Sequence, residues 1–179
     1  MFLDNYYDDI MKTDVTDFSN CANKIALYNK RVQDIKENFR RVNSLVAHHK
    51  EERKKMEDVI AGWNLKKEQY LEISKKAAAA GNMAVELKAK GTYADINGRM
   101  WILDDELDYH DTMLNLLEKA HTKLIKDAEA LKAIEATIAN EYTGEPKTVG
   151  TQTDTENADY TNTEKKEPIF SVYTDVFID

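Results

Sequence analysis

The 179-residue sequence has little of what builds turn-rich, disulfide-bonded or membrane-spanning proteins. It contains six Gly, two Pro and one cysteine, Cys21. A single cysteine can form neither an internal disulfide nor a zinc site of several thiolates, so we expect a free thiol in a reducing cytoplasm. No apolar run approaches the ~20 residues that a transmembrane helix needs. The first residues are too acidic for a signal peptide, and no membrane association is expected.

Catalytic motifs are also missing from the sequence, which contains no phosphate-binding glycine loop, nucleophile elbow or metal-ligand cluster. The adjacent His48 and His49 diverge by ~100° on a helix, and His110 and His121 lie ~16 Å apart along one, so neither pair can share a metal ion. We expect His110 and His121 to fix helix register or oligomer state, and Asp104–Asp108 to form a solvated acidic face. The sequence predicts no catalytic residue, cofactor or metal, and no enzyme.

Charge is distributed in blocks, although the net charge is −8. Residues 1–20 carry one basic and five acidic side chains, and residues 21–90 carry 16 and nine. Residues 91–140 carry five and ten, and residues 141–179 carry three and nine. A basic block therefore lies between acidic blocks. Such a pattern allows one segment to bind a polyanion while others contact proteins.

Two long segments carry mainly apolar residues at alternating steps of three and four. The first series is Ile25, Tyr28, Val32, Ile35, Phe39, Val42, Val46, His49, Arg53, Met56, Ile60, Trp63, Lys67 and Tyr70. The second series is Ile96, Met100, Leu103, Leu107, His110, Leu114, Leu117, His121, Leu124, Ala128, Leu131, Glu135 and Ile138. This heptad spacing predicts helices that each pack along a partner helix. Extra apolar residues around the second series predict that its helix has more than one neighbour.

Helix boundaries are marked less clearly. Apolar residues about four apart in residues 2–12 predict a short amphipathic helix. The segment that follows offers several N-caps for the first long helix, namely Asp14, Thr16, Asp17 and Ser19. Gly81-Asn82 and Gly91 each predict a helix stop, and Thr92 with Asp95 resembles a capping box. The connector between the long helices is therefore expected to contain a short helix of its own.

The predicted fold is all-α, with the two heptad-patterned helices forming an antiparallel hairpin. Residues 1–140 would be one helical oligomerisation domain, and residues 141–179 a flexible acidic tail too polar to order itself. The tail ends in a hydrophobic-acidic tip containing Phe170, Tyr173 and Phe177. This tip is either a docking peptide for a partner or a last element that packs on its own chain.

One basic run is the candidate nucleic-acid site. Its cations are Lys50, Arg53, Lys54 and Lys55, and aromatic residues with further lysines follow at Trp63–Tyr70. Aromatic and cationic side chains together bind single strands by stacking and phosphate contact. Basic runs on helices are, however, more often solvated faces.

Two stretches resemble the UvsY-type recombination mediators of T-even phages. Residues 22–32, ANKIALYNKRV, are similar to the N-terminal helix of that family, and residues 107–134 to its C-terminal helix. The resemblance implies a homo-oligomeric ring that binds single-stranded DNA, a RecA-like recombinase and the single-strand-binding protein. It also implies a DNA contact at Lys54, while Met56 stands where the family has a second basic residue.

We therefore expect a recombination mediator that helps load a RecA-like recombinase onto strands coated by single-strand-binding protein, in phage recombination and repair. Residues 1–140 would then be its oligomerisation and DNA-binding domain, acting in the cytoplasm of the bacterial host cell. The alternative is a structural coiled-coil assembly or scaffold protein of a phage, without a nucleic-acid role. Both hypotheses predict a homo-oligomer, so only nucleic-acid binding separates them.

Overall fold

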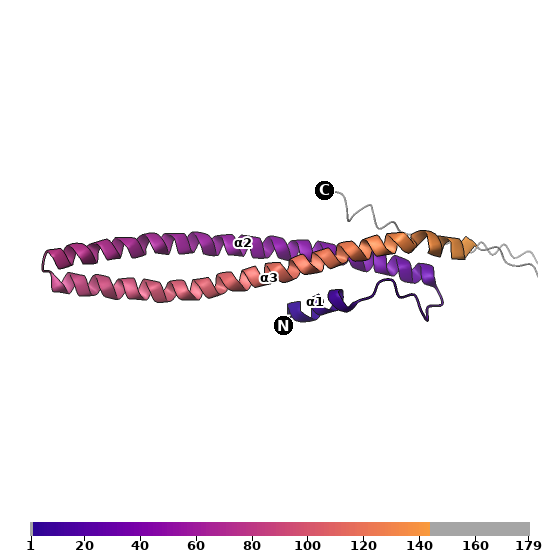
Figure 1. The fold of residues 1–179 in the computed structure, drawn as a ribbon, viewed down its shortest axis with the longest axis horizontal. Helices are drawn as coiled ribbons and strands as arrows, with labels where there is room; N and C mark the ends of the chain where they lie inside the picture. Colours follow the sequence, from indigo (N-terminus) through magenta and orange to yellow (C-terminus); the bar gives the residue numbers. More distant parts are fainter. Residues whose placement is uncertain (1, 144–179) are drawn as a thin grey trace, which may run out of the picture. The chain divides into compact units, whose positions relative to one another are not determined.

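The computed structural model describes residues 2–143, which form three helices and contain no strand. These are α1 (Phe2–Lys12), α2 (Lys24–Ala79) and α3 (Met83–Thr143) (Figure 1). The predicted all-α class is confirmed for this range, as is the short helix over residues 2–12. The tail residues Phe170, Tyr173 and Phe177 lie outside the described residues.

The chain divides into two compact units, each of which takes part of both long helices. In the described range, unit 1 combines residues 2–40 with residues 121–143, and unit 2 comprises Arg41–Ala120. Every residue of the two heptad series is buried or half-buried within these units. Burial is deepest in unit 1, where the first five residues of the α2 series are all buried.

Unit 1 holds the best-packed core of the molecule. Tyr28, Val32 and Leu131 are fully buried there. Val32 and Leu131 each contribute ~1.5–3 kcal/mol by leaving water. The helix α1 is held against α2 by a hydrogen bond from the Tyr6 hydroxyl to the backbone oxygen of Asn38, at 3.2 Å. Within unit 1, α1 therefore packs against α2 of the same chain.

In unit 2, α2 and α3 contact each other in antiparallel order. His49 meets His110 and Arg53 meets Asp111, whereas Trp63 further along α2 meets Arg99 earlier on α3. This register places the basic run of α2 beside the acidic run of α3. It also leaves much apolar surface in contact with solvent, because all but one of the large exposed apolar side chains belong to unit 2.

The turn between α2 and α3 uses the predicted glycine. Gly81 has a φ of 69°, in the left-handed region that favours glycine at a helix end. The amide of Asn82 donates to the carbonyl of Ala77 at 2.9 Å, which satisfies one of the last carbonyls of α2. The Asn82 side chain then caps α3 by accepting a hydrogen bond from the Val85 amide at 3.2 Å. The stop predicted at Gly81-Asn82 is confirmed.

The second predicted stop, at Gly91, is wrong, and so is the short connector helix. The helix α3 begins at Met83 and continues through Gly91. Thr92 does not act as a cap, because its hydroxyl donates to the carbonyl of Lys88 one turn earlier, at 3.1 Å. A helical glycine costs ~1 kcal/mol relative to alanine. Packing outweighs this cost, since Ala89 and Ile96 on either side are both 3% exposed.

The cap predicted for α2 is also wrong. Asn23 caps this helix, because its side-chain oxygen accepts a hydrogen bond from the Ala26 amide at 3.0 Å. The residues predicted as caps form hydrogen bonds within the loop before α2 instead. Asp14 and Asp17 each accept a hydrogen bond at 3.0 Å from the amide two residues further on. Such local turns are the usual alternative to helix capping for aspartate.

Candidate nucleic-acid interface

The four predicted basic residues lie within two turns of α2 in unit 2, and two of them are paired with carboxylates. Arg53 donates from Nε to Asp111 Oδ1 and from Nη1 to Glu57 Oε1, both at 2.5 Å. The hydrogen bond to Asp111 is the main cause that raises the pKa of Arg53. Lys55 contacts Glu52 at 2.8 Å and Glu51 at 2.9 Å, and these hydrogen bonds raise its pKa. Neither cation is free for a phosphate unless it leaves its partner.

Lys50 and Lys54 differ from these two. Both side chains are exposed, and neither forms an ion pair within the described part of the chain. They lie one helical turn apart, so their ammonium groups can reach neighbouring phosphates of one strand. Of the four predicted contacts, these two have the geometry that the hypothesis needs.

An acidic run of α3 lies beside this part of α2. Because Asp111 meets Arg53 and Arg99 meets Trp63, the residues of Asp104–Asp108 lie alongside the α2 segment between those two contacts. The four acidic side chains of the run are all exposed, as the sequence predicted for a solvated face. Their charge lowers the positive potential near Lys54. The surface is therefore not uniformly basic.

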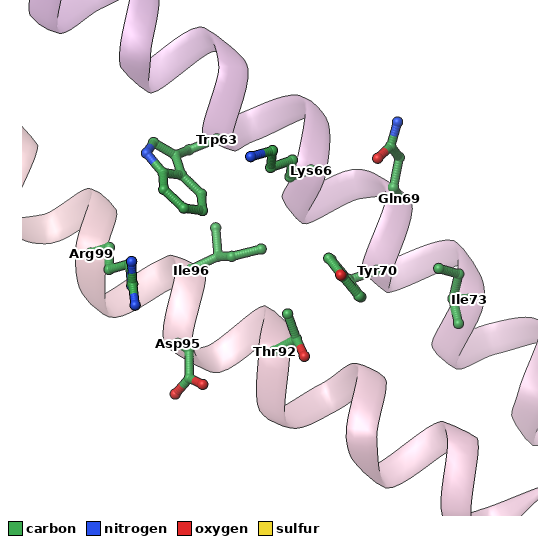
Figure 2. Close-up of a pocket in the computed structure, with 9 residues that line it drawn as sticks. All are labelled: Trp63, Lys66, Gln69, Tyr70, Ile73, Thr92, Asp95, Ile96 and Arg99. Atoms are coloured by element: carbon green, nitrogen blue, oxygen red, sulfur yellow. The ribbon is translucent and has the colours of Figure 1, made fainter.

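A groove further along unit 2 combines aromatic and cationic side chains (Figure 2). It has a volume of about 460 Å³ and lies between α2 and α3. Lys66 Nζ lies 4.7 Å from the centroid of the Trp63 ring, and Arg99 Cζ lies 5.7 Å from it. Tyr70 and Ile96 form apolar walls. We call this site the Trp63 groove. The sequence marked Trp63, Lys66 and Tyr70 as a group, but it did not indicate that Arg99 joins them from α3.

A second hollow of unit 2 also pairs a lysine with aromatic rings. Lys67 Nζ lies 5.4 Å from the centroid of the Tyr93 ring, and Trp101 lines the same hollow. Asp104 is part of its lining as well. One cation and one carboxylate leave this hollow without net charge, so it is less suited to an anion than the Trp63 groove.

Two histidines meet across the contact between α2 and α3. His49 Nδ1 and His110 Nδ1 lie 2.9 Å apart, so one ring donates a hydrogen bond and the other accepts it. Burial, then the proximity of His110 and His48, lowers the pKa of His49. Helical spacing along the sequence relates histidines of one helix only, so it gave no sign of this pair between two helices. No group of three or more potential metal ligands occurs among residues 2–143.

One side of α3 carries exposed apolar residues throughout unit 2. We call them the α3 stripe: Met83, Leu87, Trp101, Ile102 and Tyr109. Leu87 and Trp101 are two heptads apart, and Ile102 and Tyr109 are one heptad apart, so each pair is aligned along the helix, and the two lines are ~100° apart. Trp101 is 79% exposed. An exposed apolar stripe of this kind is typical of a contact surface.

The comparisons with known proteins find no match. No protein-family model, curated protein or solved structure shows significant similarity to the chain. The resemblance to UvsY-type mediators therefore stays a prediction that rests on the two helical stretches alone. Within residues 2–143, no helix combines the length and apolarity needed to cross a bilayer.

Proposed function

We propose that this chain is a recombination mediator that binds single-stranded DNA through unit 2. It would help a RecA-like recombinase load onto strands coated by single-strand-binding protein, in phage homologous recombination and repair. The observation that carries the proposal is the pair Lys50 and Lys54, which are exposed, one turn apart and without carboxylate partners in the described residues. Two such cations per protomer are a weak site alone.

Assembly of several protomers supplies the remaining affinity in this proposal. We infer that α2 and α3 form one antiparallel hairpin through both units, and that copies associate through the α3 stripe. Burying exposed side chains such as Trp101 and Ile102 gives ~25 cal/mol for each Å² of apolar area removed from water. A ring or row of protomers would repeat Lys50 and Lys54 along one strand. Weak contacts then add through multivalency.

The test compares two double variants of the full chain in a salt titration. Lys50→Ala with Lys54→Ala removes the unpaired cations. Lys12→Ala with Lys24→Ala is the matched control, because it changes the net charge equally in unit 1, where both lysines are paired with carboxylates. Binding of a fluorescent oligo(dT) is followed by anisotropy.

The first variant should bind more weakly, and its plot of log affinity against log salt should flatten by about 1.4, since each phosphate contact on a single strand contributes about 0.7. The control should keep the slope of the natural chain. Equal affinity and equal slope in all three proteins would exclude Lys50 and Lys54 as the contact. Circular dichroism of each variant verifies that the helices persist.

A second candidate function is that of a coiled-coil assembly or scaffold protein. It is favoured by the α3 stripe and by the carboxylate partners of Arg53 and Lys55, which a purely structural helix would also have. In this role, the hydrophobic-acidic tip with Phe170, Tyr173 and Phe177 is the proposed docking peptide. An assembly protein of this kind should shift a labelled oligonucleotide in a gel no more than an unrelated acidic protein does.

A further inference from the structure

The Trp63 groove has the chemistry of a site for an aromatic anion. Trp63, Tyr70 and Ile96 provide apolar walls, and Lys66 and Arg99 provide two positive charges, one from each helix (Figure 2). Neither cation forms an ion pair within residues 2–143. Asp95 is the one acidic residue among the lining side chains, so the lining carries a net charge of +1.

The size and position of the groove also fit a ligand. Its volume of about 460 Å³ lies in the ~300–1,000 Å³ range of small-molecule sites. Trp63 belongs to the heptad series and is half-buried, like the other members of the α2 series from Arg53 onward. Its indole therefore keeps exposed surface, and two cations approach the ring. An accessible aromatic ring beside cations is the combination that single-strand sites use.

We propose that the Trp63 groove binds one nucleotide unit of a single strand, with the base against the Trp63 indole and the neighbouring phosphates near Lys66 and Arg99. Stacking on an aromatic ring accepts any base, because every base has a π face. This inference rests on the proposed function and adds a second contact to it. Lys50 and Lys54 hold only phosphates, whereas this groove requires a base.

The hollow at Tyr93 and Trp101 is the alternative position for such a base. Its lining combines Lys67 with Asp104, and the carboxylate repels a phosphate. Trp101 is exposed on the α3 stripe, where a second copy of the chain would cover it. The charge of the lining therefore favours the Trp63 groove.

The experiment separates stacking from phosphate contact. The natural chain contains two tryptophans, Trp63 and Trp101. Tryptophan fluorescence is recorded on addition of oligo(dT) and of an abasic oligonucleotide that has the same number of phosphates but no bases. The variants Trp63→Phe and Trp101→Phe are measured in parallel at saturating oligonucleotide, and the affinity of each protein is measured by anisotropy.

Oligo(dT) should quench the tryptophan fluorescence of the natural chain and of the Trp101→Phe variant. The abasic oligonucleotide should quench the fluorescence of neither protein. The Trp63→Phe variant should lose the base-dependent quenching. A further variant, Trp63→Leu, should lower the affinity for oligo(dT) by about 5- to 160-fold, the range for one stacked base, and leave the affinity for the abasic oligonucleotide unchanged.

Two outcomes would overturn the inference in distinguishable ways. If both oligonucleotides bind equally well and Trp63 is not quenched, the groove takes no base, while phosphate binding by unit 2 stands. If neither oligonucleotide binds to the natural chain, the proposed function fails and the groove site fails with it. Base-dependent quenching that persists in Trp63→Phe but disappears in Trp101→Phe would place the stacked base at the other hollow.

Discussion

Acidification should destabilise unit 2 through the pair His49 and His110. His49 is 4% exposed, and its Nδ1 lies 2.9 Å from that of His110. If both rings were protonated, two N–H groups would point at each other and two positive charges would share a buried contact. Burial first, and the neighbouring His110 and His48 next, lower the pKa of His49. The folded chain therefore resists protonation at this position.

The direction and size of the effect follow from this shift. The unfolded chain has an ordinary histidine pKa of ~6.5, and the folded pKa of His49 is lower, so the unfolded state binds the proton first. Stability is complete above pH ~6.5 and falls as the pH drops from there towards the folded pKa. The free energy of unfolding should decrease by at most about 1.4 kcal/mol for each pH unit in this window, the limit for one proton bound by the unfolded chain alone.

Other charged groups surround the pair, and the variants compared at each pH must leave these groups unchanged. Glu52 and Arg53 belong to α2, and Asp111 belongs to α3 beside His110. His49→Gln keeps a hydrogen-bonding side chain at the contact and removes only the titrating ring. His48→Gln is the matched control, since His48 is the exposed neighbour.

The assay is urea unfolding followed by circular dichroism at pH 7.5, 6.5 and 5.5. The natural chain and His48→Gln should lose stability between the last two values, and His49→Gln should lose markedly less. Hydrogen exchange should locate the loss in residues 41–120. The reasoning is refuted if His49→Gln and the natural chain lose stability in parallel as the pH falls.

Two further substitutions test the packing and the glycines. Leu131→Ala, in the core of unit 1, should lower the free energy of unfolding by ~2–5 kcal/mol. Leu65→Ala, at a 60% exposed position, should change it by less than ~0.5 kcal/mol. Equal losses in urea unfolding would contradict the assigned core. Gly91→Ala should raise the melting temperature, with a gain of ~0.4–1 kcal/mol, because nothing lies within 4 Å of the added methyl group. Gly81→Ala should lower the melting temperature, because the φ of 69° strains any residue with a side chain. A higher melting temperature in both glycine variants would disprove the assigned helix end.

Elements defined by local sequence were predictable from the chain. The period of apolar residues located both long helices, and the spacing of Tyr6 and Ile10 located α1. Gly81 marked a helix end because its backbone conformation requires glycine. Gly91 looked the same in sequence and is helical, because packing of Ala89 and Ile96 decides its conformation. The residues next to Gly91 in the sequence do not by themselves reveal this packing.

Contacts between the long helices could not be predicted, because they depend on register. Arg53 and its partner Asp111 are 58 residues apart, and His49 and His110 are 61 apart. A heptad pattern is satisfied by several registers that differ by whole heptads. The sequence therefore indicated a basic run but not which of its cations are paired, and it indicated Trp63 and Lys66 without Arg99.

The most direct test of the account is a salt titration of single-strand binding by the natural chain. Anisotropy of a labelled oligo(dT) is measured from low to physiological salt. The account predicts binding whose log affinity falls linearly with log salt, with a slope of at least about 1.4 in magnitude for two phosphates per protomer. Binding no stronger than that of an unrelated acidic protein, or binding indifferent to salt, would contradict it.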